Sequence, residues 1–463
     1  MNDFIKTYSQ IQQEKIRLGG VLLHPTSFPS ERLNGDAFRW MDFMAEAGLH
    51  VWQMLPLGVP QNNLSPYQCY SAFALNPALM AEDAEIFDEH KQDNDFKAWY
   101  QREHDWLDDY ALFMALKQEY SMSAWFQWPD MYKYRDQKAL EKFRQNNLTE
   151  IFEIYWQQYQ LYSRWQRICD YARERKIYLF GDMPLFVAHD SADVWAKQDY
   201  FLLDGDGMPT VVAGVPPDYF SETGQNWGNP HYNWDVMQQN QFDWWIRRLK
   251  NHLALFDLVR IDHFRGLEAV WMIEADCETA EAGYWQKVPG DKLLQTLHDE
   301  MGAVPLVAED LGIITQEVNA LREHFNLPGM SVLQFSFDGF EDNPHKPQNI
   351  GYDRVVYTGT HDNDTTMGWF DSLDEGTQRY VLKTLDINDP GALNDTLIKV
   401  AFDTKAQLAI IPLQDFLHLG TDARMNLPGT VEGNWLWKFD WQQITDGLAT
   451  QIKQKLQQAD RLC

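Results

Sequence analysis

Three segments of the sequence each end an apolar run with a carboxylic acid. They are VRIDHFRG at 259–266, VAEDLG at 307–312 and YTGTHDND at 357–364, and the acids are Asp262, Glu309 and Asp362. A carboxylate at the end of a buried strand costs free energy of desolvation unless it is paired, hydrated or used in chemistry. A single acid in such a place is as often an ion-pair partner or a helix cap, and Asp310 and Asp364 can be interpreted in that way. Three acids in three similar motifs favour one shared site.

The residues around these acids indicate different protonation states. Arg260 stands two residues before Asp262, so both side chains point to one face of a strand, and the fixed cation keeps the carboxylate ionised. Glu309 has no basic neighbour in its motif, and a less solvated carboxyl keeps its proton more readily. An ionised and a protonated carboxyl can together cleave a glycosidic bond, because one attacks the anomeric carbon while the other protonates the leaving oxygen. Asp362, beside His361, can hold sugar hydroxyls.

The elements that must position these acids are strand-like apolar stretches that end in polar residues. Eight of them begin at Gly19, His50, Ile177, Leu258, Pro305, Met330, Arg354 and Leu408. Amphipathic helical patterns lie between them, as in DWLDDYALFMALKQEY from Asp105. Alternating strands and helices imply parallel strands joined by crossovers, and eight such units predict an α/β fold of the (β/α)8 TIM barrel type. The carboxyl ends of barrel strands meet at one mouth, so we expect the three acids to converge there.

The chain of 463 residues is predicted to form one catalytic barrel domain, 1–463, because no repeat, low-complexity tract or Gly/Ser linker divides it. Two intervals are too long for one helix each. The interval at about 59–176, after the second strand, is helix-rich, and the one at about 188–257, after the third, is loop-rich. Both follow the carboxyl ends of strands, where barrel enzymes build their sites. We therefore expect both insertions to form subdomains that line a substrate cleft.

The composition argues against several classes of partner. The 68 acidic residues outnumber the 39 basic ones, and a net charge of −29 repels nucleic acid and anionic membrane surfaces. The four cysteines are scattered without C-x-x-C spacing, and no nucleotide, zinc or serine-hydrolase motif is present. No basic segment followed by an apolar one opens the sequence, and nowhere do about 18 apolar residues run together. The sequence predicts no nucleotide or zinc site, no nucleic acid or membrane partner, and a cytoplasmic location. It gives no indication of oligomeric state.

Aromatic residues are a weaker indication of a sugar ligand. The chain has 19 Trp and 20 Tyr, and the C–H faces of sugars pack on aromatic rings. Most of these rings stand at helical spacing and are interpreted as core. Tyr67 in SPYQCYSAFA and Trp227 in GQNWGNP lie in Pro/Gly-rich loops and are better candidates for a site.

Several longer motifs resemble those of one enzyme family. They are the three acidic motifs together with SPYQCYSAFALNP, GDMPLFVAHDSADVW, GVPPDYFSETGQNWGNP and DARMNLPGTVEGNW. The sequence is similar, from about Leu18 to Trp437, to the amylomaltases, which are 4-α-glucanotransferases or disproportionating enzymes related to α-amylases. The resemblance implies a retaining (β/α)8 enzyme that needs no cofactor. It moves an α-1,4-glucan segment from a donor to the 4-hydroxyl of an acceptor glucose or glucan, with maltooligosaccharides serving as both.

The resemblance also implies a role for each matching residue. Asp262 takes the place of the nucleophile, Glu309 that of the general acid/base and Asp362 that of the acid which stabilises the transition state. Arg260 stands beside the nucleophile, and His361 contacts the sugar in the cleavage subsite. The other implied substrate contacts are Ser65, Tyr67, Asp182, Asp218, Trp227 and Asn426. Residue reasoning alone leaves two alternatives open, an α-glucan hydrolase and a catalytically silent glucan-binding protein.

Overall fold

The computed structural model describes residues 14–83, 94–217, 221–302 and 304–462. Its centre is a sheet of eight parallel strands in the order β10-β11-β12-β1-β2-β3-β6-β9. The strands are β1 Leu18–Leu22, β2 Val51–Gln53, β3 Tyr178–Met183, β6 Leu258–Ile261, β9 Leu306–Ala308, β10 Gly329–Val332, β11 Arg354–Tyr357 and β12 Leu408–Pro412. The two ends of the sheet meet where the Ala308 N–H donates to the Pro328 carbonyl at 2.8 Å. The sheet is therefore a nearly closed barrel, and the predicted (β/α)8 fold is confirmed.

The barrel strands alternate between two apolar layers. One residue set, which includes Leu22, Phe180, Leu258 and Tyr357, forms a cluster within the barrel. The residues next to them, such as Val21, Leu179 and Val259, pack outward against the helices. Successive side chains of a strand point to opposite faces, so both faces of these strands are buried. Asp182 and Arg260 have the parity of Phe180 and Leu258, which aims them inward at the carboxyl end of the barrel.

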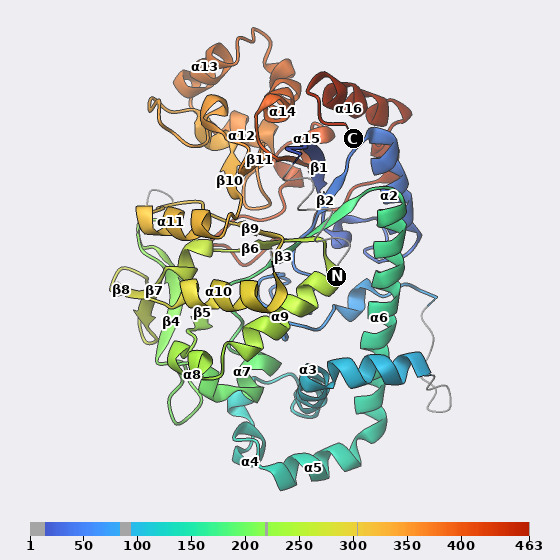
Figure 1. Ribbon diagram of the computed structural model, residues 1–463, viewed down its shortest axis with the longest axis vertical. Coiled ribbons are helices and arrows are strands. Elements are labelled where there is room, and N and C mark those ends of the chain that lie inside the picture. The colour runs from blue at the N-terminus through green and yellow to red at the C-terminus, as the bar shows by residue number, and fades with distance from the viewer. Residues whose placement is uncertain (1–13, 84–93, 218–220, 303, 463) are drawn as a thin grey trace.

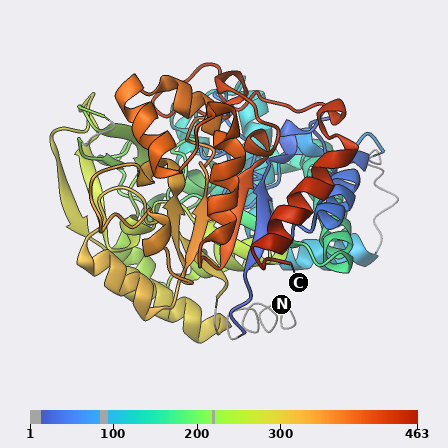
Figure 2. The ribbon, with the colours of Figure 1, turned by 90° about the horizontal axis from the view of Figure 1, so that it is seen from above.

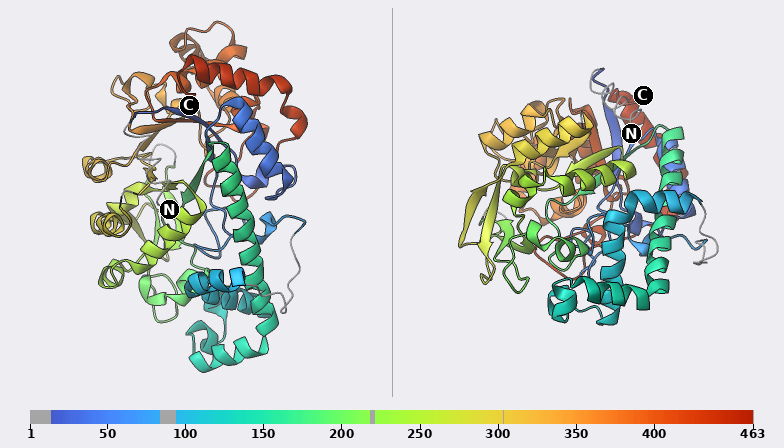
Figure 3. Two further views of the ribbon diagram at one scale, coloured as in Figure 1. Left: turned by 45° about the vertical axis from the view of Figure 1, so that its right-hand side comes forward. Right: turned by 60° about the horizontal axis from the view of Figure 1, so that its bottom comes forward.

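The long segment between β2 and β3 contains mainly helices. They are α3 Asn94–Glu119, α4 Asp130–Lys133, α5 Gln137–Asn146 and α6 Leu148–Glu174. Helix α6 runs from α5 to the barrel, and α3 crosses it and packs against it (Figures 1 and 3). Aromatic side chains fill the contact between α3 and α6, where the ring of Phe96 lies against Trp156 and Tyr159.

A second sheet, which is antiparallel, joins two segments that are distant in the sequence. Its strands β4 Val211–Val215, β5 Gln225–Pro230, β7 Ala269–Glu274 and β8 Gly283–Lys287 lie in the order β5-β4-β7-β8. It projects from one side of the barrel (Figures 1 and 2). The segment 188–257 was expected to be loop-rich, yet it contributes β4 and β5. The Gly, Asn and Pro content of GQNWGNP hides a strand that forms by pairing with β4, and β4 pairs in turn with the distant β7.

The remaining helices cover the barrel and its ends. They are α2 Gly35–Ala47, α7 Ala192–Ala196, α8 Trp234–Gln239, α9 Asp243–Leu255, α10 Gly290–Met301, α11 Gln316–His324, α12 Thr366–Ser372, α13 Glu375–Thr384, α14 Leu393–Asp403, α15 Leu413–Phe416 and α16 Asp446–Gln458. Helix α16 packs against α2 beside β1 (Figure 2). Among the helices of the described ranges, none combines the length and the apolar character that a membrane span needs.

Candidate active site

Strand ends and loops at the carboxyl end of the barrel bring together most of the residues predicted for the site. Asp182 lies on β3 and Arg260 on β6, and these two residues are register partners on neighbouring strands. Asp262 and Glu309 come directly after β6 and β9. Tyr67 follows β2, the pair His361 and Asp362 follows β11, and Asn426 lies beyond β12 and α15.

Arg260 is the central cation of the site. Its Nη1 donates to both carboxylate oxygens of Asp182, at 2.8 and 2.7 Å, and its Nη2 lies 2.8 Å from Asp262 Oδ1. The Arg260 side chain is 5% exposed and the Asp182 side chain is 0% exposed, whereas 29% of the Asp262 side chain remains exposed. Arg260 therefore fixes the orientation of Asp262 and neutralises a buried carboxylate, while part of Asp262 stays open to the mouth.

Glu309 is held beside Asp262 by the backbone. Its Oε2 accepts from the His263 N–H at 2.7 Å, and its Oε1 accepts from the Leu311 N–H at 2.9 Å. Burial and the charge of Asp262 raise the pKa of Glu309 to about 7, although Arg260 and the two amides oppose this shift. At neutral pH the carboxyl therefore exchanges a proton readily, as a group that acts first as an acid and then as a base must do.

The chain turns sharply between the two carboxyls. His263 has a φ of 50°, in the left-handed region that side chains other than glycine rarely adopt. This turn lets the His263 amide reach Glu309 while Asp262 points to Arg260. Such backbone strain, which costs about 1 to 3 kcal/mol, is typical of functional sites.

Asp362 is held by its own loop and by the segment that follows α15. The Asn426 Nδ2 donates to its Oδ1 at 2.6 Å, and the His361 Nε2 lies 3.3 Å from its Oδ2. The side chain is 45% exposed, so the carboxylate can still receive hydrogen bonds from a ligand. The Arg424 guanidinium donates to the backbone carbonyl of Asp362 at 2.7 Å and to that of Asn426 at 2.7 Å.

Tyr67 links the two halves of the site. Its hydroxyl donates to Asp182 Oδ2 at 2.8 Å and lies 2.8 Å from His361 Nε2. Because its one proton goes to Asp182, the Tyr67 oxygen must accept from an Nε2–H of His361, which sets the tautomer of that ring. Burial and the charge of Asp182 hold the pKa of Tyr67 well above its usual value. A continuous set of contacts thus runs from Asp262 to Asp362, and Glu309 is tied to it through the amide of the residue after Asp262.

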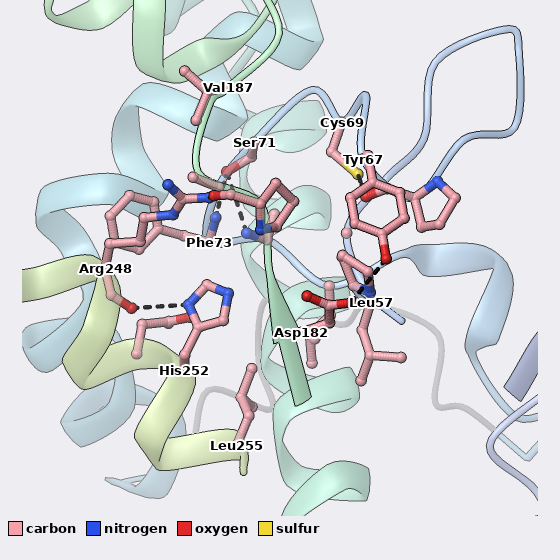
Figure 4. Close-up of a pocket in the computed structure, with 18 of the residues that line it drawn as sticks. Leu57, Tyr67, Cys69, Ser71, Phe73, Asp182, Val187, Arg248, His252 and Leu255 are labelled. Atoms are coloured by element: carbon pink, nitrogen blue, oxygen red, sulfur yellow. Dashed lines mark hydrogen bonds between the residues drawn. The ribbon is translucent and has the colours of Figure 1, made fainter. Parts of the chain in front are cut away.

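The pocket behind Tyr67 and Asp182 is closed by α9. Tyr67 and Asp182 lie at one side of it, and Arg248 and His252 lie at the other (Figure 4). Arg248 is 1% exposed and donates to the carbonyl of Pro184 at 2.6 Å, which fixes the backbone just beyond the strand that carries Asp182.

Three further residues were predicted to contact the substrate, Ser65, Trp227 and Asp218. Ser65 is a loop residue whose hydroxyl accepts from the Tyr67 N–H at 3.3 Å, so it positions Tyr67. Trp227, on β5, packs edge-on against the His263 ring at a centroid distance of 4.9 Å. It therefore contacts the residue that directly follows Asp262 in the sequence. Asp218 lies outside the described residues.

Two residues of the site were missed by the sequence reasoning, Arg424 and Trp435. The Trp435 ring lies 6.1 Å, between centroids, from both Tyr67 and His361, and its φ of 65° is unusual for so large a side chain. The signal that selected Tyr67 and Trp227, an aromatic ring in a Gly-rich polar loop, was also present in GTVEGNW. Arg424 gave no such signal, because its role depends on a loop distant in the sequence.

Comparisons with known proteins identify the family of the chain. A family model described as 4-alpha-glucanotransferase matches residues 23–89 and 79–443. The 4-alpha-glucanotransferase of Synechocystis sp. is 43% identical to the chain, over 94% of the chain and 96% of the relative. The structure of an amylomaltase from Streptococcus agalactiae in complex with acarbose superposes with a TM-score of 0.91 at 32% identity, covering 96% of this chain and 100% of that one. An α-amylase from Geobacillus thermoleovorans, with a TM-score of 0.52 at 10% identity, shares the fold. The chain belongs to the 4-α-glucanotransferase family.

Proposed function

We propose that this chain transfers α-1,4-glucan segments between maltooligosaccharides by double displacement, with Asp262 as nucleophile, Glu309 as acid/base and Asp362 as the stabiliser of the transition state. The observation that carries the assignment is the continuous set of contacts from Asp262 through Arg260, Asp182, Tyr67 and His361 to Asp362. Glu309 joins this set through the amide of His263, the residue that follows Asp262. It supports one site in which all three acids act on the same sugar.

In the first half of the reaction the donor glucan is cleaved. An oxygen of Asp262 bonds to the anomeric carbon as the bond from that carbon to the leaving 4-oxygen breaks, and Glu309 gives its proton to that oxygen. The pKa of Glu309, raised to about 7, supports the acid role, and the guanidinium of Arg260 at 2.8 Å supports an ionised Asp262. The products are a covalent glucosyl-enzyme and a shortened glucan.

In the second half the acceptor replaces the leaving group. Glu309, now ionised, removes the proton of the acceptor 4-hydroxyl as its oxygen bonds to the anomeric carbon and the bond to Asp262 breaks. Two inversions restore the α-configuration. The enzyme returns to its starting protonation state, because Glu309 regains the proton it gave up.

Asp362 acts while the sugar ring is planar and positively charged. Its partly exposed carboxylate accepts hydroxyl hydrogen bonds that strengthen in the oxocarbenium-like state, so it binds the transition state more tightly than the ground state. Asn426 and His361 hold the carboxylate in place during this step.

Transfer requires that a sugar outcompete water for the intermediate. We propose that residues 424–437 and the insertions at about 59–176 and 188–257 form the walls that bind the glucan. Tyr67, Trp227 and Trp435 support this, because each comes from one of these segments and lies against a residue of the acidic site.

The cellular setting is a further part of the proposal. The free thiols Cys69, Cys169 and Cys277 support a reducing compartment such as the cytoplasm. Maltodextrins released from starch or glycogen supply donors and acceptors of the required chemistry. Fractionation of cells that produce the protein, followed by immunoblotting, tests the location.

Incubation with maltotriose tests the reaction. Transfer predicts glucose together with a series of maltodextrins longer than maltotriose, whereas products that are only shorter would favour hydrolysis and contradict the proposal. The Asp262→Asn variant serves as the control and is expected to leave maltotriose unchanged.

A further inference from the structure

Asp415 is a buried carboxylate outside the acidic site. It lies on α15, directly after the last barrel strand, and is 1% exposed. Its Oδ2 accepts from the hydroxyls of Thr358 at 2.5 Å and Thr366 at 2.8 Å, and its Oδ1 accepts from the Thr366 N–H at 2.8 Å. All three donors are uncharged, and they belong to just two residues. The cost of burying this carboxylate is therefore offset by hydrogen bonds from Thr358 and Thr366.

These two residues mark the ends of the loop that carries His361 and Asp362. Thr358 comes directly after β11, and Thr366 is the first residue of α12. Inside the loop the Asn363 Oδ1 accepts from the N–H and the hydroxyl of Thr360, both at 2.9 Å, which makes it a compact turn. A compact turn moves as a unit, so the positions of its two ends set the position of the Asp362 carboxylate.

The other side of the loop is held by the segment at 421–426. The Thr421 hydroxyl donates to Asp364 Oδ2 at 3.0 Å, and Asn426 donates to the Asp362 carboxylate. Those partners are at least partly open to solvent, whereas Asp415 and Thr366 are fully buried. Asp415 thus supplies a buried part of the support.

We propose that Asp415 is a positioning residue, which joins the end of β11 to the start of α12 and so fixes Asp362 for catalysis. The inference rests on the role proposed above for Asp362.

A carboxylate suits this task better than the amide of the same shape. Both of its oxygens accept, so it can take three hydrogen bonds from the two threonines. An asparagine keeps one accepting oxygen, which must stay at the Thr366 N–H because a backbone amide cannot accept. Its N–H₂ group then faces both threonine hydroxyls, and both must rotate to accept. Asn at this position therefore preserves part of the support, and Ala preserves none.

The test compares kcat, KM for maltotriose and thermal stability among variants, each assayed well below its melting temperature. Asp415→Ala is expected to lower kcat by about 10²-fold while KM changes less than threefold, since small misplacements of a reacting group cost about this much. The kcat of Asp415→Asn should be at least fivefold higher than that of Asp415→Ala.

Asp257→Asn is the matched control. Asp257 accepts from the Leu179 N–H at 2.8 Å at the amino end of the barrel, away from the acids, and burial raises its pKa to about 6. This variant also loses a carboxylate that is largely shielded from solvent, but its kcat should stay within twofold of the wild-type value.

The outcomes separate this inference from the proposed function. If Asp362→Asn is inactive but Asp415→Ala keeps kcat within threefold, or loses no more than Asp257→Asn, the role of Asp415 is refuted and the function stands. If Asp362→Asn keeps full activity, both fail. Should Asp415→Ala not fold, Thr366→Val replaces it. This variant keeps the hydrogen bond from the backbone N–H of residue 366 to Asp415 and loses the one from the hydroxyl. Its kcat should therefore fall severalfold, and a wild-type kcat would overturn the inference.

Discussion

Replacement of Glu309 by Gln should change the pH dependence of protein stability in a way that the structure fixes in sign and size. The folded protein raises the pKa of Glu309 from 4.5 to about 7. The folded state therefore binds this proton more tightly than the unfolded state. The stability that the protonated carboxyl contributes is complete below pH 4.5 and is lost as the pH rises through 7.

The size of the effect follows from the two pKa values. Between pH 5 and pH 8 the wild-type protein should lose about 2 to 3 kcal/mol of unfolding free energy through Glu309. The Gln variant has no such titration, although it exchanges one backbone hydrogen bond for a misplaced N–H₂ group. That penalty is nearly independent of pH. The pH dependence of the difference in unfolding free energy between the two proteins therefore reports the ionisation of Glu309 alone.

Differential scanning fluorimetry at pH 5 and pH 8 measures this change. The melting temperature of Glu309→Gln relative to wild type should rise by about 3 °C from pH 5 to pH 8. Glu375→Gln, which removes a 90% exposed carboxylate on α13, is the control and should show no such rise. A constant difference for Glu309→Gln at the two pH values would refute the raised pKa and, with it, the physical basis of the acid role.

Three further substitutions test other parts of the site. Asp262→Asn should lower kcat by at least about 10⁴-fold, because the nucleophile is lost, and calorimetry should show maltoheptaose binding within threefold of wild type. Arg260→Met leaves Asp182 buried without its cation and should cost about 3 to 5 kcal/mol of unfolding free energy, measured by thermal denaturation against Arg379→Met on the surface. Trp435→Ala should raise KM for maltotriose up to about tenfold with little change in kcat, and an unchanged KM would show that the ring only packs on Tyr67 and His361.

The barrel and the positions of its acids could be predicted from the sequence because both depend on local patterns. Each strand is a short apolar run between helical segments, and parallel strands with both faces buried keep that signal strong. Asp262 and Glu309 end such runs directly, so their place at the mouth followed from the strands.

The parts that were missed depend on contacts between distant segments. Strand β5 is a strand only because β4 pairs with it, and β4 in turn pairs with β7. Arg424 acts through a carbonyl 62 residues away, and Asp415 through threonines 49 and 57 residues away. Nothing in LQDFL distinguishes Asp415 from an ordinary strand-end acid, because its partners are chosen by the closure of the barrel.

The most direct test of the mechanism is the capture of the covalent intermediate. Glu309→Gln should still react with maltotriosyl fluoride, since fluoride leaves without a proton, but it should transfer the sugar onward only slowly because the base is missing. Mass spectrometry of the digested protein is predicted to find one maltotriosyl group on the peptide that contains Asp262. A sugar on any other residue, or consumption of the fluoride without an adduct, would contradict the account.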